Sequence, residues 1–131
     1  MTQSVFTEVA LVAAGAAVGG AFRYFTVNYA TFGIGSFVGT FVANFAGCLL
    51  IGILWAVLEW ANAPRSIYLL LVTGLLGGYT TFSAFALDTV AMLEHGMWLR
   101  GLGYAAASVL GGIAACAAGL FATRALIKIL Q

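Results

Sequence analysis

The sequence predicts an all-α membrane protein that crosses a bilayer four times. Of its 131 residues, 63% are hydrophobic and only 7% are charged, whereas a soluble domain has about a quarter charged residues. The five basic and four acidic residues cannot cover a water-facing surface. They also leave long uncharged runs at 9–22, 24–58, 66–87 and 101–123. A helix needs about 20 apolar residues to cross the hydrocarbon core, so these runs have the length of membrane spans.

The first two predicted helices cover residues 5–28 and 36–60. The first has no basic N-terminal region, and Arg23 follows its apolar run where a cleavage region would be expected. We therefore expect it to remain as a span and not to act as a signal peptide. The uncharged run 24–58 is too long for one helix. Residues 28–36 (NYATFGIGS) are rich in glycine and small polar side chains, which predicts a turn there.

The third and fourth predicted helices cover residues 66–93 and 99–129. Pro64, the only proline, can open a helix at its first turn and is expected to precede the third helix. Gly96 suits the end of that helix, and Trp98 suits the membrane interface. Residues 1–131 are thus predicted to form a single four-helix transmembrane domain, with no room for a second domain.

The reactive residue types form no recognisable chemical site. Cys48 and Cys116 lie inside predicted spans at a spacing that matches no metal or redox motif, so we expect them to pack as small apolar side chains. His95 has no companion ligand or nucleophile. A net charge of +1 indicates no nucleic-acid partner. The sequence therefore does not predict an enzyme.

Basic residues are almost evenly divided between the two predicted membrane faces. Arg65, Arg124 and Lys128 belong to one face, and Arg23 and Arg100 to the other. Because Lys and Arg near helix ends set orientation, this balance predicts insertion in both orientations. Such a dual-topology chain is able to form an antiparallel homodimer.

Glycine is abundant, with 17 residues, and small residues recur four positions apart. Such spacing lets transmembrane helices approach closely. It supports either tight bundling within the chain or dimerisation, and it occurs at Gly15/Gly19, Gly35/Gly39, Gly74/Gly78 and Ser108/Gly112.

Asn44 is a polar residue near the middle of the second predicted span. Hydrocarbon offers its amide no hydrogen-bond partner, so the side chain must either join two helices or line a pore. The sequence does not choose between these roles.

Residues 74–85 (GLLGGYTTFSAF) predict a break near the middle of the third helix, because adjacent glycines are followed by two threonines and a serine. Broken helices at membrane depth line cavities or hold ions. The alternative is a continuous helix whose hydroxyls bond back to its own carbonyls. Phe82 and Phe85 share a face if the chain is helical after the break. Their rings either pack against other side chains or lipid, or turn their electropositive edges toward an anion.

Three motifs resemble those of the Fluc (CrcB) family of fluoride channels. They are residues 19–24 (GGAFRY), residues 39–44 (GTFVAN) and residues 77–85 (GGYTTFSAF). The resemblance extends over essentially the whole chain in length, number of spans and order of motifs. The third motif is highly specific to the family, whereas the arginine motif alone would be weak.

The resemblance implies an antiparallel, dual-topology homodimer in the cell inner membrane. Two narrow pores would export fluoride passively and protect the cell from it. A structural sodium ion would lie at the dimer interface, held by the backbone carbonyls of Gly77 and Thr80 from both subunits. Arg23 would draw anions into the aqueous vestibule, although it also suits an interfacial position without such a role. The residues implied along the fluoride pathway are Asn44, Phe82, Phe85, Thr40, Thr81, Ser83, Tyr104 and Ser108.

Two positions depart from the family pattern, and two other protein classes are possible. Asp88 stands where a glutamate is common, and Gly112 offers no hydroxyl one turn beyond Ser108. A small exporter of the multidrug-resistance type would also be an antiparallel dimer of this length. It requires an intramembrane carboxylate, and Glu8, the only candidate in the first helix, lies close to the N-terminus. A structural membrane subunit would explain the glycines but not residues 77–85.

Overall fold

The computed structural model describes residues 4–30 and 35–131, and every regular element in these two ranges is helical. In chain order the elements are α1 (Val5–Phe25), the π-helical turn η1 (Thr26–Ala30), α2 (Ser36–Trp60), α3 (Arg65–Ile67), the π-helical segment η2 (Tyr68–Leu76), α4 (Gly77–Tyr79), α5 (Phe82–Glu94) and α6 (Trp98–Ile129).

These elements form four apolar segments long enough to cross a membrane, which confirms the four-span prediction. The segments are Val5–Tyr29, Ser36–Trp60, Arg65–Glu94 and Trp98–Ile129, and their ends differ from the predicted ones by one residue at most. The third segment, residues 65–94, is called the third span below. Within the predicted turn at 28–36, residues 31–34 lie outside the described part of the chain.

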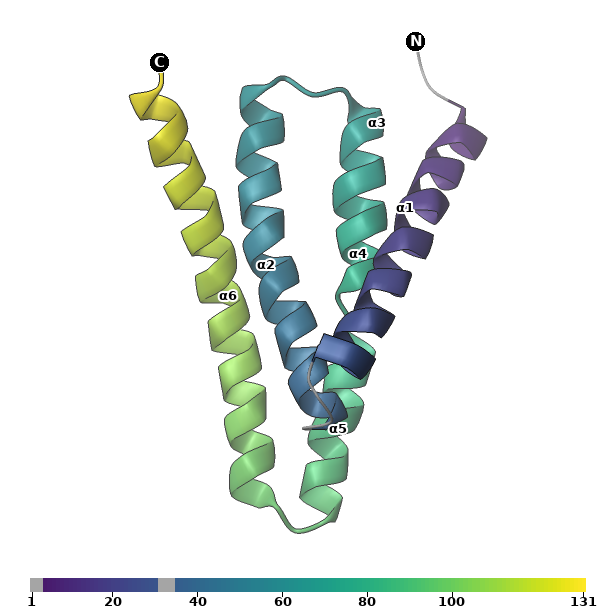
Figure 1. Ribbon diagram of the computed structural model, residues 1–131, viewed down its shortest axis with the longest axis vertical. Coiled ribbons are helices and arrows are strands. Elements are labelled where there is room, and N and C mark those ends of the chain that lie inside the picture. Colours follow the sequence, from purple (N-terminus) through teal and green to yellow (C-terminus); the bar gives the residue numbers. More distant parts are fainter. Residues whose placement is uncertain (1–3, 31–34) are drawn as a thin grey trace.

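The spans run alternately in opposite directions (Figure 1). The start of α1, the end of α6 and the turn between α2 and α3 lie at one end of the bundle, and the turn between α5 and α6 lies at the other. α2 packs between α6 and the third span, while α1 lies against η2 and α4. The third span therefore has α1 on one side and α2 on the other.

Two of the longer helices, α2 and α5, are followed by a residue in the left-handed backbone conformation. After α2, Asn62 has φ 47°, and the Ala63 amide donates to the carbonyl of Leu58 at 3.0 Å. After α5, Gly96 has φ 72°, and the Met97 amide donates to the carbonyl of Met92 at 2.9 Å. Both turns bond carbonyls that lack a helical donor, as left-handed helix caps do. Gly96 thus ends its helix as the sequence predicts.

Pro64 immediately precedes the third span and caps its first turn. Its backbone is extended, with φ −67° and ψ 152°, and its carbonyl accepts from the Ile67 amide at 3.0 Å. Proline suits this position because its fixed φ leads into a helix and its missing N–H costs no hydrogen bond.

Two of the predicted small-residue motifs pack against each other within one chain. A Cβ atom on Gly15 would lie 3.0 Å from the Cα atom of Gly74, and a Cβ atom on Gly78 would lie 2.5 Å from the carbonyl oxygen of Ala16. Gly19 approaches the backbone of Leu75 just as closely. The absence of side chains at these positions lets α1 and the third span come into backbone contact.

The other two small-residue motifs have different roles. Gly35 precedes α2 at φ 128°, so it belongs to the turn and not to a helix-packing pair. A Cβ atom on Gly112 would lie 3.3 Å from Cys48 Sγ, between α2 and α6. Cys48 and Cys116 are both free thiols and both half-buried. Their packing between the helices agrees with their predicted role.

Two ion pairs lie at the end of the bundle that holds the termini. Arg65 Nε lies 2.8 Å from Glu8 Oε1 and joins the third span to α1. Arg124 Nη2 lies 2.7 Å from Glu59 Oε2 and joins α6 to α2. The Arg65 side chain is 73% exposed in the isolated chain, so the pairs add little stability. They do balance two of the three basic residues at this end.

Candidate functional site

The third span is interrupted at Thr80 and Thr81. α4 ends at Tyr79, and both threonines have extended backbone, with φ −87° and ψ 158° at Thr80 and φ −151° and ψ 118° at Thr81. α5 begins at Phe82. The preceding glycines, Gly77 and Gly78, are themselves helical.

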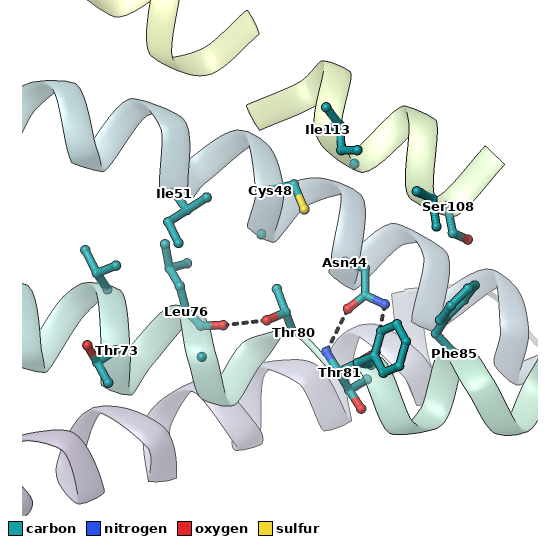
Figure 2. A pocket seen from close by; sticks show the side chains of 16 residues that line it. Asn44, Cys48, Ile51, Thr73, Leu76, Thr80, Thr81, Phe85, Ser108 and Ile113 are labelled. Atoms are coloured by element: carbon teal, nitrogen blue, oxygen red, sulfur yellow. Dashed lines mark hydrogen bonds between the residues drawn. The ribbon is translucent and has the colours of Figure 1, made fainter. Parts of the chain in front are cut away.

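The side chain of Asn44 holds the extended residue from α2 (Figure 2). Its Nδ2 donates to the carbonyl of Thr81 at 2.9 Å, and its Oδ1 accepts from the Thr81 amide at 2.7 Å. One side-chain amide therefore satisfies both backbone polar groups of Thr81, as a neighbouring peptide group would. Without such a partner these groups would be unpaired at membrane depth.

At the break, the two amides that would donate to the carbonyls of Gly77 and Thr80 in a continuous helix donate to other acceptors. In a continuous α-helix the Thr81 amide would donate to Gly77 and the Ala84 amide to Thr80. Here the Thr81 amide donates to Asn44, and the Ala84 amide donates to Thr81 Oγ1 at 3.2 Å. Thr81 thus caps α5. The Thr80 amide and hydroxyl both donate to the carbonyl of Leu76 at 3.0 Å.

A groove of about 430 Å³ lies beside the break, between α2, the third span and α6. Its wall is largely apolar and includes Ile51, Leu76 and Ile113 (Figure 2). A hydrophobic wall with a few convergent polar groups is typical of a binding site or a conduction pathway. The groove brings together seven of the residues that the sequence indicates: Asn44, Gly77, Thr80, Thr81, Phe82, Phe85 and Ser108.

Aromatic rings continue from the groove into the packing between α5 and α6. The centroids of Phe82 and Phe85 are 5.5 Å apart, and those of Phe85 and Tyr104 are also 5.5 Å apart. Phe37 from α2 meets Tyr104 edge-on, with centroids 5.9 Å apart and an interplanar angle of 87°. Phe82, at the outer end of the row, is 78% exposed in the single chain.

Two buried hydroxyls beside these rings have no hydrogen-bond partner within the described residues. They belong to Tyr104, which is 8% exposed, and to Ser108, one turn later on α6. Asp88 Oδ2 is also buried and unpaired within this part of the chain, while Asp88 Oδ1 accepts from the Ser36 hydroxyl at 3.4 Å. Burying an unpaired polar group costs about 1–3 kcal/mol. These groups are thus candidates for contact with a ligand.

Four predicted pathway residues lie outside the groove lining: Tyr104, Thr40, Ser83 and Arg23. Thr40 is buried one turn before Asn44, and its hydroxyl donates to the carbonyl of Ser36 at 3.1 Å. The Ser83 hydroxyl lies 3.2 Å from Thr81 Oγ1. Arg23 lies near the end of α1, and it forms no ion pair with the described residues.

Gly47 and Cys48 also line the groove, although the sequence motifs did not single them out for the site. Gly47 follows Asn44 by three positions on α2, which places both on one helix face. The spacing of three residues from Asn44 is the sequence feature that could have identified Gly47 as part of the site. Gly47 has no side-chain group that could bind a ligand.

Four apolar spans, a groove between three of them and nearby buried hydroxyls with no partner among the described residues define a small multi-pass membrane transport protein. Residues 10–120 match the family described as CrcB-like protein, Camphor Resistance (CrcB). The chain belongs to this family, which confirms the resemblance seen in its motifs.

Curated relatives cover nearly the whole chain. A protein of Pseudomonas putida strain F1 is 43% identical over 119 residues, which are 88% of this chain and 96% of the relative. A protein of Rhizobium etli is 43% identical over 123 residues, 92% of this chain and 98% of the relative. A protein of Chloroflexus aurantiacus is 40% identical over 116 residues, 86% of this chain and 92% of the relative. Each of the three is named fluoride-specific ion channel FluC.

Proposed function

We propose that this chain is a fluoride-selective channel, and not an enzyme, in the inner membrane. It lets fluoride leave the cell passively and so lowers the cytoplasmic fluoride concentration. The relatives named as fluoride-specific channels support this function over nearly the full chain. In the structure, the observation that carries it is the pair of buried hydroxyls of Tyr104 and Ser108 that have no partner among the described residues. An anion is the ligand that such donors would bind.

The selectivity follows from the cost of removing water from a small ion. A dry pore must replace the hydration of fluoride with hydrogen-bond donors. The Asn44 amide has two N–H donors, of which Thr81 uses one; the second, which has no partner among the described residues, would donate to the ion. We place the ring edges of Phe82 and Phe85 along the same path, because an aromatic edge carries partial positive charge. The hydroxyls assigned to the path are those of Thr40, Thr81, Ser83, Tyr104 and Ser108.

Arg23 is proposed to act before the pore. A basic side chain near the end of α1 would raise the local anion concentration in the aqueous vestibule. Its effect would decrease as salt screens the charge.

The carbonyls of Gly77 and Thr80 are proposed to hold a structural sodium ion. Their helical donors are engaged elsewhere, and carbonyl oxygens suit a hard cation. A second copy of the chain would supply the remaining ligands, and the ion would tie the two subunits together. Sodium should then raise the thermal midpoint of the purified protein. N-methylglucamine at equal ionic strength should not.

The working unit is proposed to be an antiparallel homodimer of chains inserted in both orientations. The near balance of basic residues between the two ends, three against two, supports this. A reporter on the C-terminus should be found on both sides of the membrane in comparable amounts. A reporter found on one side only would exclude dual topology.

The exporter alternative is disfavoured by the position of Glu8. That carboxylate lies in the first turn of α1 and is paired with Arg65. A channel needs no coupling ion, so proteoliposomes should release fluoride down its gradient with equal pH on both sides. Proton-driven export of an organic cation, with no release of fluoride, would instead support the multidrug-resistance-type exporter.

A further inference from the structure

We infer that Asn44 and Gly47, on one face of α2, are positioning residues that form a seat for the break in the third span. The seat sets the extended backbone of Thr80 and Thr81 and so presents the carbonyls of Gly77 and Thr80 to a cation. That a cation binds these carbonyls depends on the sodium site proposed above. The seat is a property of one chain and is tested separately.

Asn44 contributes the hydrogen bonds of the seat. Its amide donates to the Thr81 carbonyl at 2.9 Å and accepts from the Thr81 amide at 2.7 Å. Leucine has nearly the same shape as asparagine but lacks the donor and the acceptor. In the leucine variant, the Thr81 amide would lack this acceptor, and its partner in a continuous α-helix is the Gly77 carbonyl. If the Thr81 amide bonded the Gly77 carbonyl in this way, that carbonyl would no longer be free to bind a cation.

Gly47 contributes the space of the seat. It is buried, and a Cβ atom at this position would lie 2.2 Å from Thr80 Cγ2. The next nearest atom, Tyr79 Cδ1, would be at an ordinary contact distance of 3.4 Å. Thr80 cannot rotate its methyl group away at no cost, because its hydroxyl donates to the carbonyl of Leu76 at 3.0 Å. Alanine at position 47 must therefore displace Thr80.

All contacts of the seat lie within a single chain. The amides that would bond Gly77 and Thr80 are engaged by Asn44 and Thr81 without any contribution from a second copy. The carbonyls are thus arranged before the cation binds, and no helical turn has to open on binding. Preorganisation of this kind lowers the free-energy cost of association.

The first experiment tests the seat without sodium. The thermal midpoint of the purified protein is measured in sodium-free buffer for Gly47→Ala, Thr80→Ser and the double variant. Gly47→Ala should lower the midpoint by about 5 °C, and Thr80→Ser should restore it, because serine keeps the hydroxyl and lacks Cγ2. Gly103→Ala on α6 is the matched control, since a Cβ atom there meets nothing within 4 Å. An unchanged midpoint in Gly47→Ala, or no restoration by Thr80→Ser, would overturn the inference.

The second experiment tests the presentation of the carbonyls. The sodium concentration that gives half of the maximal rise in thermal midpoint is measured at constant ionic strength. It should increase about tenfold or more in Asn44→Leu and in Gly47→Ala, and it should return to the wild-type value in Gly47→Ala with Thr80→Ser. A wild-type sodium response in Asn44→Leu would refute the positioning role of Asn44. If the wild-type protein does not respond to sodium, the sodium proposal fails, and the sodium-free experiment alone decides whether the seat stands.

Discussion

Replacing Phe85 by isoleucine should reduce fluoride efflux from proteoliposomes by about tenfold, a loss of about 1.4 kcal/mol of stabilisation along the ion path, because the electropositive ring edge is removed. Phe85 lines the groove and contacts the rings of Phe82 and Tyr104. Isoleucine fills similar volume but has no electropositive ring edge to offer an anion. The same change at Phe82 should act in the same direction and should cost the single chain little packing, because that ring is 78% exposed.

The matched control is Phe121→Ile, which removes an exposed ring on α6 that does not line the groove. Its efflux should equal that of the wild type. All three variants should elute as the wild type does on size exclusion, which separates conduction from assembly. Unchanged efflux in Phe82→Ile and Phe85→Ile would remove the rings from the fluoride pathway.

Tyr104→Phe should lower fluoride efflux by about tenfold while leaving the protein as stable as the wild type or more stable. The Tyr104 hydroxyl is buried and meets no hydrogen-bonding geometry with the described residues, so its removal should cost the fold little. Removing an unpaired buried group relieves its desolvation cost. A permeating anion, in contrast, loses a donor. If only the ion uses this hydroxyl, its removal should lower fluoride efflux without lowering the stability of the protein.

Efflux and thermal midpoint are measured on the same preparation of Tyr104→Phe, with Ser108→Ala as a second test of the same kind. Thr89→Val serves as the control, because the Thr89 hydroxyl donates to its own helix at the carbonyl of Phe85, 2.8 Å away. A stability loss in Tyr104→Phe with normal efflux would assign the hydroxyl to the fold.

The four spans could be predicted because scarcity of charge and segment length are local properties of the sequence. The helix ends were also predictable where Pro64 and Gly96 impose local backbone geometry. Whether the glycine motifs serve bundling or dimerisation was not predictable. The answer for Gly15 and Gly74 depends on contact between two spans far apart in the chain.

The location of the extended residues in the third span could not be derived from residues 74–85 alone. The pattern predicts a break within residues 74–85 without locating it; Gly77 and Gly78 are helical, and the extended pair is Thr80 and Thr81. The Thr81 backbone is bonded to Asn44, which is 37 positions away in the sequence. Of the two roles left open for Asn44, the contact between helices is present in the structure, and the second N–H remains for the proposed pore.

Fluoride and chloride efflux from proteoliposomes that carry the purified protein test the central claim most directly. Both anions are loaded in the same vesicles, with equal pH on both sides and valinomycin to carry compensating potassium, and each anion is followed with its own electrode. The account predicts fluoride release with chloride retained, because the donors and ring edges beside Tyr104 and Phe85 suit a small dehydrated anion. No release of fluoride, or equal release of chloride, would contradict it.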